Sequence, residues 1–129
     1  MRAWADVYRQ WRGLLHSGRV VRIDTADAAI AAHGVVAASG DRALYSIATV
    51  GTPADALPPA LRLPGLDAER RYAVRPVSLG PAPVTIADAP PAWYHAGVAE
   101  QRGRTLETVG LAVPLMAPEQ LLLLEAVAL

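Results

Sequence analysis

Short apolar runs of period two, separated by turns rich in glycine and proline, make up most of the chain after Gly18. Residues 19–24, 33–38 and 43–50 are three such runs, and the short turn 39–42 joins the last two. Alternation of apolar and polar residues is typical of strands with one buried face, and a short turn between two of them predicts a hairpin. The first half of the chain is therefore expected to form antiparallel strands.

The second half begins with a loop at residues 51–59, which hold three of the prolines. The Pro-Gly pair at 64–65 suits a type II turn. Residues 71–75 then place Tyr72 and Val74 on one face and arginines on the other, as in a half-buried antiparallel sheet. Strand formation is thus expected to resume after the turn.

The remainder of the chain is expected to contain a loop at residues 80–103 and strands at 105–114 and 120–129. Four consecutive leucines at 121–124 are apolar on both faces, which indicates a central strand covered on both sides; a buried helix is the alternative there. Strands with frequent turns favour two packed antiparallel sheets. We predict an all-β fold: a Greek-key-like antiparallel β-sandwich of about seven or eight strands at residues 19–129, preceded by one N-terminal α-helix at 1–18.

The N-terminal segment follows the helical period instead. Its apolar residues recur at spacings of three and four, which predicts an amphipathic helix that ends near Gly18. The predicted apolar face consists of Trp4, Val7, Tyr8, Trp11, Leu14 and Leu15. This face either lies on the chain's own sheet or packs on a preceding domain or a second copy of the chain, and the sequence leaves these alternatives open.

Composition excludes several classes of function. The 12 basic and 12 acidic residues give a net charge of zero, whereas nucleic-acid-binding domains usually carry a basic excess. The absence of cysteine excludes disulfides, thiolate metal sites and cysteine nucleophiles. No apolar run approaches the ~20 residues of a membrane span, and charges interrupt the apolar positions at the start of the chain, as they do not in a signal peptide. We expect a cytoplasmic chain that binds neither nucleic acid nor membrane and uses no cofactor.

Familiar catalytic motifs are also missing from the sequence. It contains no nucleophile elbow, no phosphate-binding loop and no H-E-x-x-H motif. The histidines His16, His33 and His95 lack the spacing of metal ligands. We therefore predict no catalytic residues and no metal site.

Two pairs of carboxylates are further candidates for a functional site. Asp24 and Asp27 could offer oxygen ligands to a cation, but aspartates at a strand end more often cap a turn. Glu119 and Glu125 could act as acid and base only across a cleft, and their leucine neighbours favour a solvated strand end.

Trp93 and Tyr94 form an aromatic pair in a proline-rich segment. Exposed aromatic rings stack on sugars, so the pair could make weak carbohydrate contacts. The alternative is that these aromatics anchor the segment against the sheet.

Several segments resemble the C-terminal portion of bacterial α-galactosidases of glycoside hydrolase family 36. The helix and its junction with the first strand are the specific part, because that family has a helix of the type Y-x-x-x-R-x-L-L-H-x-G-R-V-x-R here. The matching residues are Tyr8, Arg12, Leu14, Leu15, His16, Gly18, Arg19, Val20 and Arg22. Further similarity lies at residues 32–36 and 43–45, in the hairpin of 61–67 with Tyr72 and Val74, and in closing strands at 105–106, 110–111 and 118–120.

The resemblance implies that residues 1–18 are similar to the last helix of a catalytic barrel and that residues 19–129 form the sandwich that follows it. In that family both catalytic aspartates lie on the barrel, and no segment of this chain matches the barrel motifs. The resemblance thus implies a non-catalytic module whose partner is the barrel of its parent glycosidase, with self-association as a further expectation.

Overall fold

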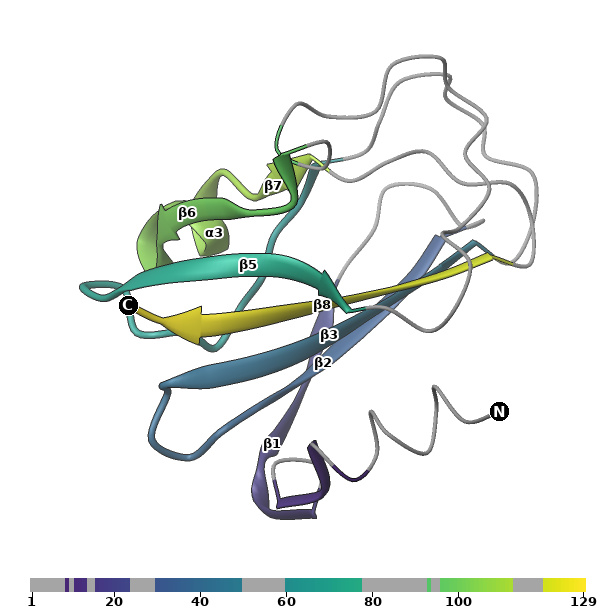
Figure 1. Cartoon of the computed structure of the whole chain (residues 1–129), viewed down its shortest axis with the longest axis horizontal. Coiled ribbons are helices and arrows are strands. Elements are labelled where there is room, and N and C mark those ends of the chain that lie inside the picture. Colours follow the sequence, from purple (N-terminus) through teal and green to yellow (C-terminus); the bar gives the residue numbers. More distant parts are fainter. Residues whose placement is uncertain are drawn as a thin grey trace.

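The computed structural model describes residues 9, 11–13, 16–23, 30–49, 60–77, 93, 96–112 and 120–129. Within these ranges the chain forms eight strands and the helix α3, Gly103–Thr108 (Figure 1). Residues 9, 11–13 and 16–17 are helical as well. The strands are β1 (Arg19–Ile23), β2 (Ile30–Val36), β3 (Arg42–Thr49), β4 (Ala60–Leu61), β5 (Arg71–Val77), β6 (Ala99–Arg102), β7 (Leu111–Ala112) and β8 (Gln120–Ala128).

Six strands form one antiparallel sheet in the order β1-β2-β3-β8-β5-β6 (Figure 1). The first three strands follow one another along the chain, and β2 and β3 form the predicted hairpin. The last strand, β8, returns to lie between β3 and β5. This return from the far end of the sequence is Greek-key-like, and it confirms the predicted all-β antiparallel fold.

The leucine-rich strand β8 is covered on both faces, as its sequence predicts. Leu122 and Leu124 point into the main hydrophobic cluster, while Leu123 joins a second cluster on the opposite face of the sheet. Alternate residues of a strand face opposite sides, so a strand that is apolar at every position needs cover on both sides. The alternative of a buried helix at these residues is wrong.

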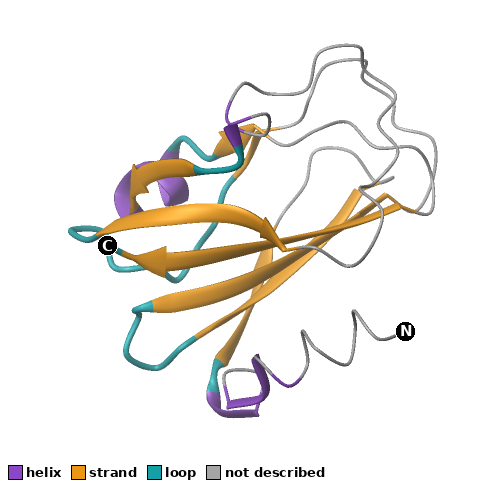
Figure 2. Cartoon of the chain, in the orientation of Figure 1, coloured by secondary structure: helices purple, strands orange, loops and turns teal. Residues whose placement is uncertain are grey.

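A second layer closes the main cluster on the inner face of the sheet. It consists of the two-stranded sheet β4–β7, helix α3 and the segment between β4 and β5 (Figure 2). Its buried residues are Leu61, Leu63, Leu66, Leu106 and Leu111. They pack against the inner faces of the central strands, so the main core lies between the six-stranded sheet and this layer.

The strand predicted at residues 105–114 is wrong for its first half, which belongs to α3. Only Leu106 of its last four helical residues is buried, so the segment has too short an apolar pattern to reveal its period. The stop signal is Gly110, which has a φ of 87° and whose N–H bonds to the carbonyl of Thr105. A left-handed glycine just past the last turn is a typical helix end. Within the described residues, the predicted strand is present as β7, and residues 113–114 lie outside them.

The loop predicted at residues 80–103 is wrong at its end, where Ala99–Arg102 forms the edge strand β6. Three of its four residues are exposed, and only Ala99 is buried. An edge strand with a single buried residue shows no alternation, and pairing with β5 stabilises it instead. The rest of the predicted loop up to residue 92 lies outside the described residues.

The hairpin that family resemblance suggested between residues 61–67 and β5 is also wrong. Leu61 in β4 pairs with Leu111 in β7, whereas β5 pairs with β6 and β8. The Pro64-Gly65 turn is present, and Gly65 has a φ of 92° that suits the third position of a type II turn. The segment that follows β4 therefore crosses between layers and does not fold back on its own neighbour.

Candidate functional site

The outer face of the six-stranded sheet is the surface from which we build the candidate site. Antiparallel register aligns its side chains in rows, because directly opposite residues share a face. One row runs through Val20, Val35, Leu44, Glu125 and Arg75 across five strands. Val20, Val35 and Leu44 in this row are apolar, and Glu125 and Arg75 at its other end are charged.

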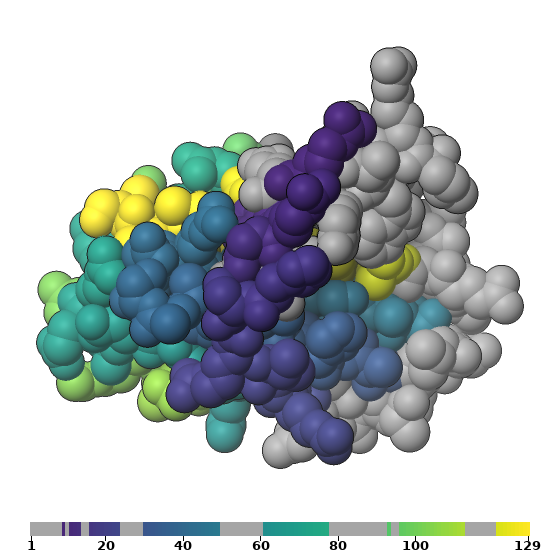
Figure 3. Space-filling model, turned by 90° about the horizontal axis from the view of Figure 1, so that it is seen from below, coloured from purple at the N-terminus to yellow at the C-terminus, as the bar shows by residue number. Residues whose placement is uncertain are grey.

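The N-terminal helical segment covers part of the apolar surface on the outer face. Trp11 is only 1% exposed and shares a cluster with Leu44 and Leu123, against which Val35 and Val77 pack in part. Figure 3 shows the N-terminal residues, in purple, lying against the blue strands of the sheet. The sequence left open whether this helix face lies on the chain's own sheet or packs elsewhere. Trp11 lies on the chain's own sheet.

Two polar features accompany Trp11. The guanidinium of Arg42 lies 5.1 Å from the centroid of the indole ring, within the range of a cation–π contact. The indole Nε1, by contrast, is buried without a hydrogen-bond partner within the described residues. The other residues of the predicted face, Trp4, Val7, Tyr8, Leu14 and Leu15, lie outside the described part of the chain.

Trp93 lies on the opposite side of the molecule, against the main cluster. Its side chain is half-buried, and its indole N–H donates to the carbonyl of Ala112 in β7 at 2.6 Å. The indole ring thus packs against the core with part of its surface, and its N–H is hydrogen-bonded within the chain. These contacts favour the interpretation that Trp93 anchors its segment over the interpretation that it stacks on a sugar. Tyr94 lies outside the described residues.

Two fully buried tyrosines tie the second layer to the sheet, and sequence reasoning did not single out either hydroxyl. The Tyr45 hydroxyl donates to the carbonyl of Pro64 at 2.9 Å. The Tyr72 hydroxyl donates to the carbonyl of Gly40 and accepts the N–H of Asp67. Burial, and secondarily the neighbouring Tyr72, raises the pKa of Tyr45 well above its ordinary value. Both hydroxyls therefore hold turns in place.

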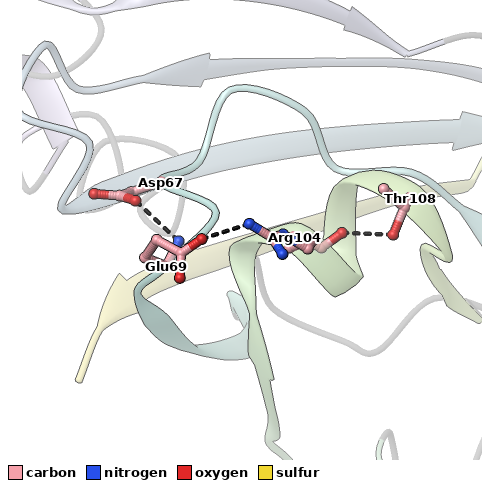
Figure 4. A network of polar contacts seen from close by, with 4 residues as sticks. All are labelled: Asp67, Glu69, Arg104 and Thr108. Carbon is pink, nitrogen blue, oxygen red and sulfur yellow. Dashed lines mark hydrogen bonds and ion pairs between the residues drawn. The ribbon is translucent and has the colours of Figure 1, made fainter.

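A polar network on the surface joins α3 to the turn before β5 (Figure 4). Arg104 forms an ion pair with Glu69, whose N–H donates to the carboxylate of Asp67, and the Thr108 hydroxyl donates to the carbonyl of Arg104. The ion-paired side chains are about two thirds exposed, at 67% and 71%. Exposed pairs contribute little to stability, about 0–1 kcal/mol.

The structure does not gather the remaining ionisable candidates into a site. His16 and His33 are exposed, and no group of three metal-binding side chains occurs among the described residues. Glu125 is half-buried on the outer face, opposite Arg75. His95, Asp24, Asp27 and Glu119 lie outside the described ranges. No helix in the described part of the chain is long and apolar enough to cross a membrane.

Comparisons with known proteins agree with one another. The family model for the glycosyl hydrolase family 36 C-terminal domain matches residues 30–121. The α-galactosidase of Escherichia coli is 34% identical over 129 residues, which cover 95% of this chain and 18% of that protein. This chain therefore spans less than a fifth of the length of that relative.

Solved structures show the same fold. An α-galactosidase from Geobacillus stearothermophilus matches with a TM-score of 0.71 at 22% identity, over 96% of this chain and 15% of that one. An α-galactosidase from Lactobacillus brevis matches with a TM-score of 0.71 at 18% identity, over 97% of this chain and 16% of that one.

Proposed function

Because this chain belongs to the glycosyl hydrolase family 36 C-terminal domain family, we propose that it is a non-catalytic β-sandwich module that packs on the catalytic barrel of an α-galactosidase and stabilises it. The observation that carries the proposal is the unequal coverage of the match. Nearly the whole of this chain, 95%, aligns with only 18% of the Escherichia coli α-galactosidase. Such a segment corresponds to one part of a larger enzyme, and most of that enzyme's machinery lies elsewhere in its length.

The geometry of the described residues supports a structural role. Retaining glycosidases need two carboxyl groups about 5–5.5 Å apart in a sugar-binding pocket. The described carboxylates with assigned contacts are used locally: Glu69 pairs with Arg104, and Asp41 accepts a hydrogen bond from Ser39. That hydrogen bond is the largest cause lowering the pKa of Asp41, which marks a turn-capping group.

The division of labour within the chain is part of the same proposal. Residues 1–18 would connect the barrel to the sandwich at residues 19–129, and Trp11 would fasten that connection to the sheet. A helix that shares a buried cluster with the sheet holds the sandwich at a fixed position relative to whatever precedes it. The cytoplasmic location, self-association and weak carbohydrate binding expected from the sequence stay predictions.

A hybrid enzyme tests the proposed function. The segment of the Escherichia coli α-galactosidase that matches this chain is replaced by these 129 residues. We expect a soluble enzyme that hydrolyses a chromogenic α-galactoside, whereas the isolated chain shows no turnover. Hydrolysis is measured by release of the chromophore, and folding by thermal denaturation.

The matched control is the same Escherichia coli enzyme with the segment deleted. We expect the deleted form to aggregate or to denature well below the hybrid, because apolar surface of its barrel is left exposed. Turnover by the repurified isolated chain would contradict the proposal, and so would a deleted form as stable and active as the hybrid.

A further inference from the structure

The short strand β6 lies at one edge of the six-stranded sheet. It has β5 on one side, and no strand of the described residues pairs with its other side. The side chains of Glu100, Gln101 and Arg102 are all exposed. An edge strand presents unpaired N–H and C=O groups, so it is a template on which another strand can pair.

The backbone hydrogen bonds show which residues of β6 face this open edge. In an antiparallel sheet, successive residues of a strand direct their N–H and C=O groups to opposite sides. The N–H of Gly103 donates to the carbonyl of Arg70 at 2.9 Å, so the backbone of Gly103 faces β5. Gln101 therefore faces β5 as well, and Glu100 and Arg102 direct their backbone groups to the open edge.

Glu100 and Arg102 also share the outer face of the sheet. Arg102 lies directly opposite Arg71, and Glu100 lies directly opposite Ala73. Like charges directly opposite each other destabilise a sheet, and diagonal neighbours are about 7–8 Å apart. Within one chain, Glu100 thus offsets the repulsion between the two arginines only from a diagonal position.

The order of charges along β6 is complementary to itself. If two copies of the strand pair antiparallel about a two-fold axis through Gln101, Glu100 of each copy lies opposite Arg102 of the other. Registers shifted by two residues either way set two copies of Glu100 or two copies of Arg102 against each other. Opposite charges therefore favour the register about Gln101 over both shifted registers.

The other edge of the sheet lacks this complementarity. The strand β1 (Arg19–Ile23) contains two arginines and no acidic residue, so pairing with a second β1 gains no opposite charges. Charged side chains on an edge strand usually discourage pairing with another chain. β6 differs because its two charges are opposite in sign and two residues apart.

We propose that two copies of this chain associate through β6, antiparallel about Gln101, and join their six-stranded sheets into one. Glu100 and Arg102 exchange backbone hydrogen bonds across the axis and pair their side chains. The second copy's Glu100 thereby lies opposite Arg102, on the side away from Arg71. This inference goes beyond the proposed function, and its surface differs from the N-terminal helix face. Because the contact is small, we expect a weak dimer, with a dissociation constant of about 0.01–1 mM.

Reversing the two charges tests the pairing with substitutions at exposed positions. Glu100→Arg leaves only positive charges at positions 100 and 102, and Arg102→Glu leaves only negative ones. We expect each variant alone to associate at least about tenfold more weakly than the original chain, because both cross-axis pairs then repel. In an equimolar mixture both pairs are opposite in charge, so association should return. Sedimentation velocity at up to about 1 mM protein measures it.

The matched controls are Arg22→Glu and Glu107→Arg, which make the same changes of charge at exposed positions outside β6. We expect both controls to associate like the original chain. Recovery on mixing separates pairing from a structural role, because two damaged folds do not repair each other. An original chain that stays monomeric up to about 1 mM would overturn the proposal. Reversed variants that associate like the original, or a mixture that stays monomeric, would do the same.

Amide NMR of the original chain locates the contact without any variant. Between about 0.05 and 1 mM protein, we expect the amide signals of Glu100 and Arg102 to shift most, since their N–H groups gain partners. The amide signals of β1 should stay unchanged. Shifts centred on β1 or on the N-terminal helical segment would show association through another surface and contradict the proposal.

Discussion

Two glycines of this chain differ in whether their surroundings leave room for a side chain. Gly103 begins α3 where the backbone of the preceding turn crosses it, and a Cβ added there would overlap the carbonyl oxygen of Asp67. Gly13 lies in the N-terminal helical segment with nothing within 4 Å of the position a Cβ would take. One glycine is thus required by close packing, and the other only adds backbone freedom to the unfolded state.

Substituting alanine at these positions should therefore have effects of opposite sign. We expect Gly103→Ala to lower the free energy of unfolding by about 1–3 kcal/mol, because backbone must shift. We expect Gly13→Ala to raise it by about 0.5–1 kcal/mol, because alanine favours a helix. Urea denaturation followed by circular dichroism measures both. A Gly103→Ala protein as stable as the original would show that the approach of α3 to Asp67 is looser than described.

Tyr45 makes the stability of the chain depend on pH in the alkaline range. Its pKa in the folded state is raised above the ordinary value of about 10, chiefly by burial, so folding favours the neutral phenol. The resulting stabilisation is complete below pH ~10 and is lost as the pH rises towards the folded-state pKa, with a slope of up to about 1.4 kcal/mol per pH unit.

Tyr45→Phe isolates this contribution, because phenylalanine keeps the ring and removes the hydroxyl. Near pH 7 we expect the variant to be about 1–2 kcal/mol less stable, since the carbonyl of Pro64 loses its donor. Above pH ~10 the difference should shrink, because only the original protein must bury an ionisable phenol. Urea denaturation at a series of pH values measures the difference. A constant difference up to pH ~11 would contradict the raised pKa.

Among the elements, β8 depends on partners on both of its faces. Trp11 and Leu123 share the outer cluster, whereas Leu124 lies in the main cluster on the inner face. If the N-terminal helical segment is an integral part of the folded sheet, substitutions of Trp11 and Leu123 should be coupled. Substitutions of Trp11 and Leu124 should not be.

A double-mutant cycle measures this coupling. We expect Trp11→Ala alone to lower the free energy of unfolding by about 3–5 kcal/mol. With Leu123→Ala added, the combined loss should fall short of the sum by about 0.5–3 kcal/mol, since the first substitution already opens the site. With Leu124→Ala the losses should add to within about 0.5 kcal/mol. Additivity in both cycles would mean that Trp11 does not hold the helix on β8.

The elements also differ in how far the sequence predicts them. β1, β2, β3 and β8 carry apolar residues in repeating patterns, so their strand character is visible in the sequence. α3 and β6 each bury only one or two residues, and both are stabilised by contacts with other elements of the folded chain. Short elements with little buried surface have no period to detect.

At the scale of the whole molecule, the sheet separates two clusters that each contain a tryptophan. Trp11 reports on the outer cluster, and Trp93 reports on the main core. The same strands contribute residues to both clusters. We therefore expect both clusters to be lost in a single unfolding transition, as in most domains of this size.

Single-tryptophan proteins test this cooperativity. In Trp4→Phe/Trp93→Phe the fluorescence comes from Trp11, and in Trp4→Phe/Trp11→Phe it comes from Trp93. We expect the fluorescence midpoint of each protein in urea to coincide with its own midpoint by far-ultraviolet circular dichroism. An earlier fluorescence transition in the Trp11 protein would show that the helix leaves the sheet before the sheet unfolds.

The sequence by itself determines that this chain forms an antiparallel all-β fold with an amphipathic segment before it, because period-two alternation and turn residues are local properties. It also indicates that β8 is covered on both faces, since four consecutive leucines allow few other arrangements. Only the tertiary structure decides that Trp11 provides one of those covers and that β4 pairs with β7. The meeting of Arg71 with Arg102 depends on it as well. Each of these contacts joins residues far apart in the chain, and their pairing depends on register and layer order, which no local pattern encodes.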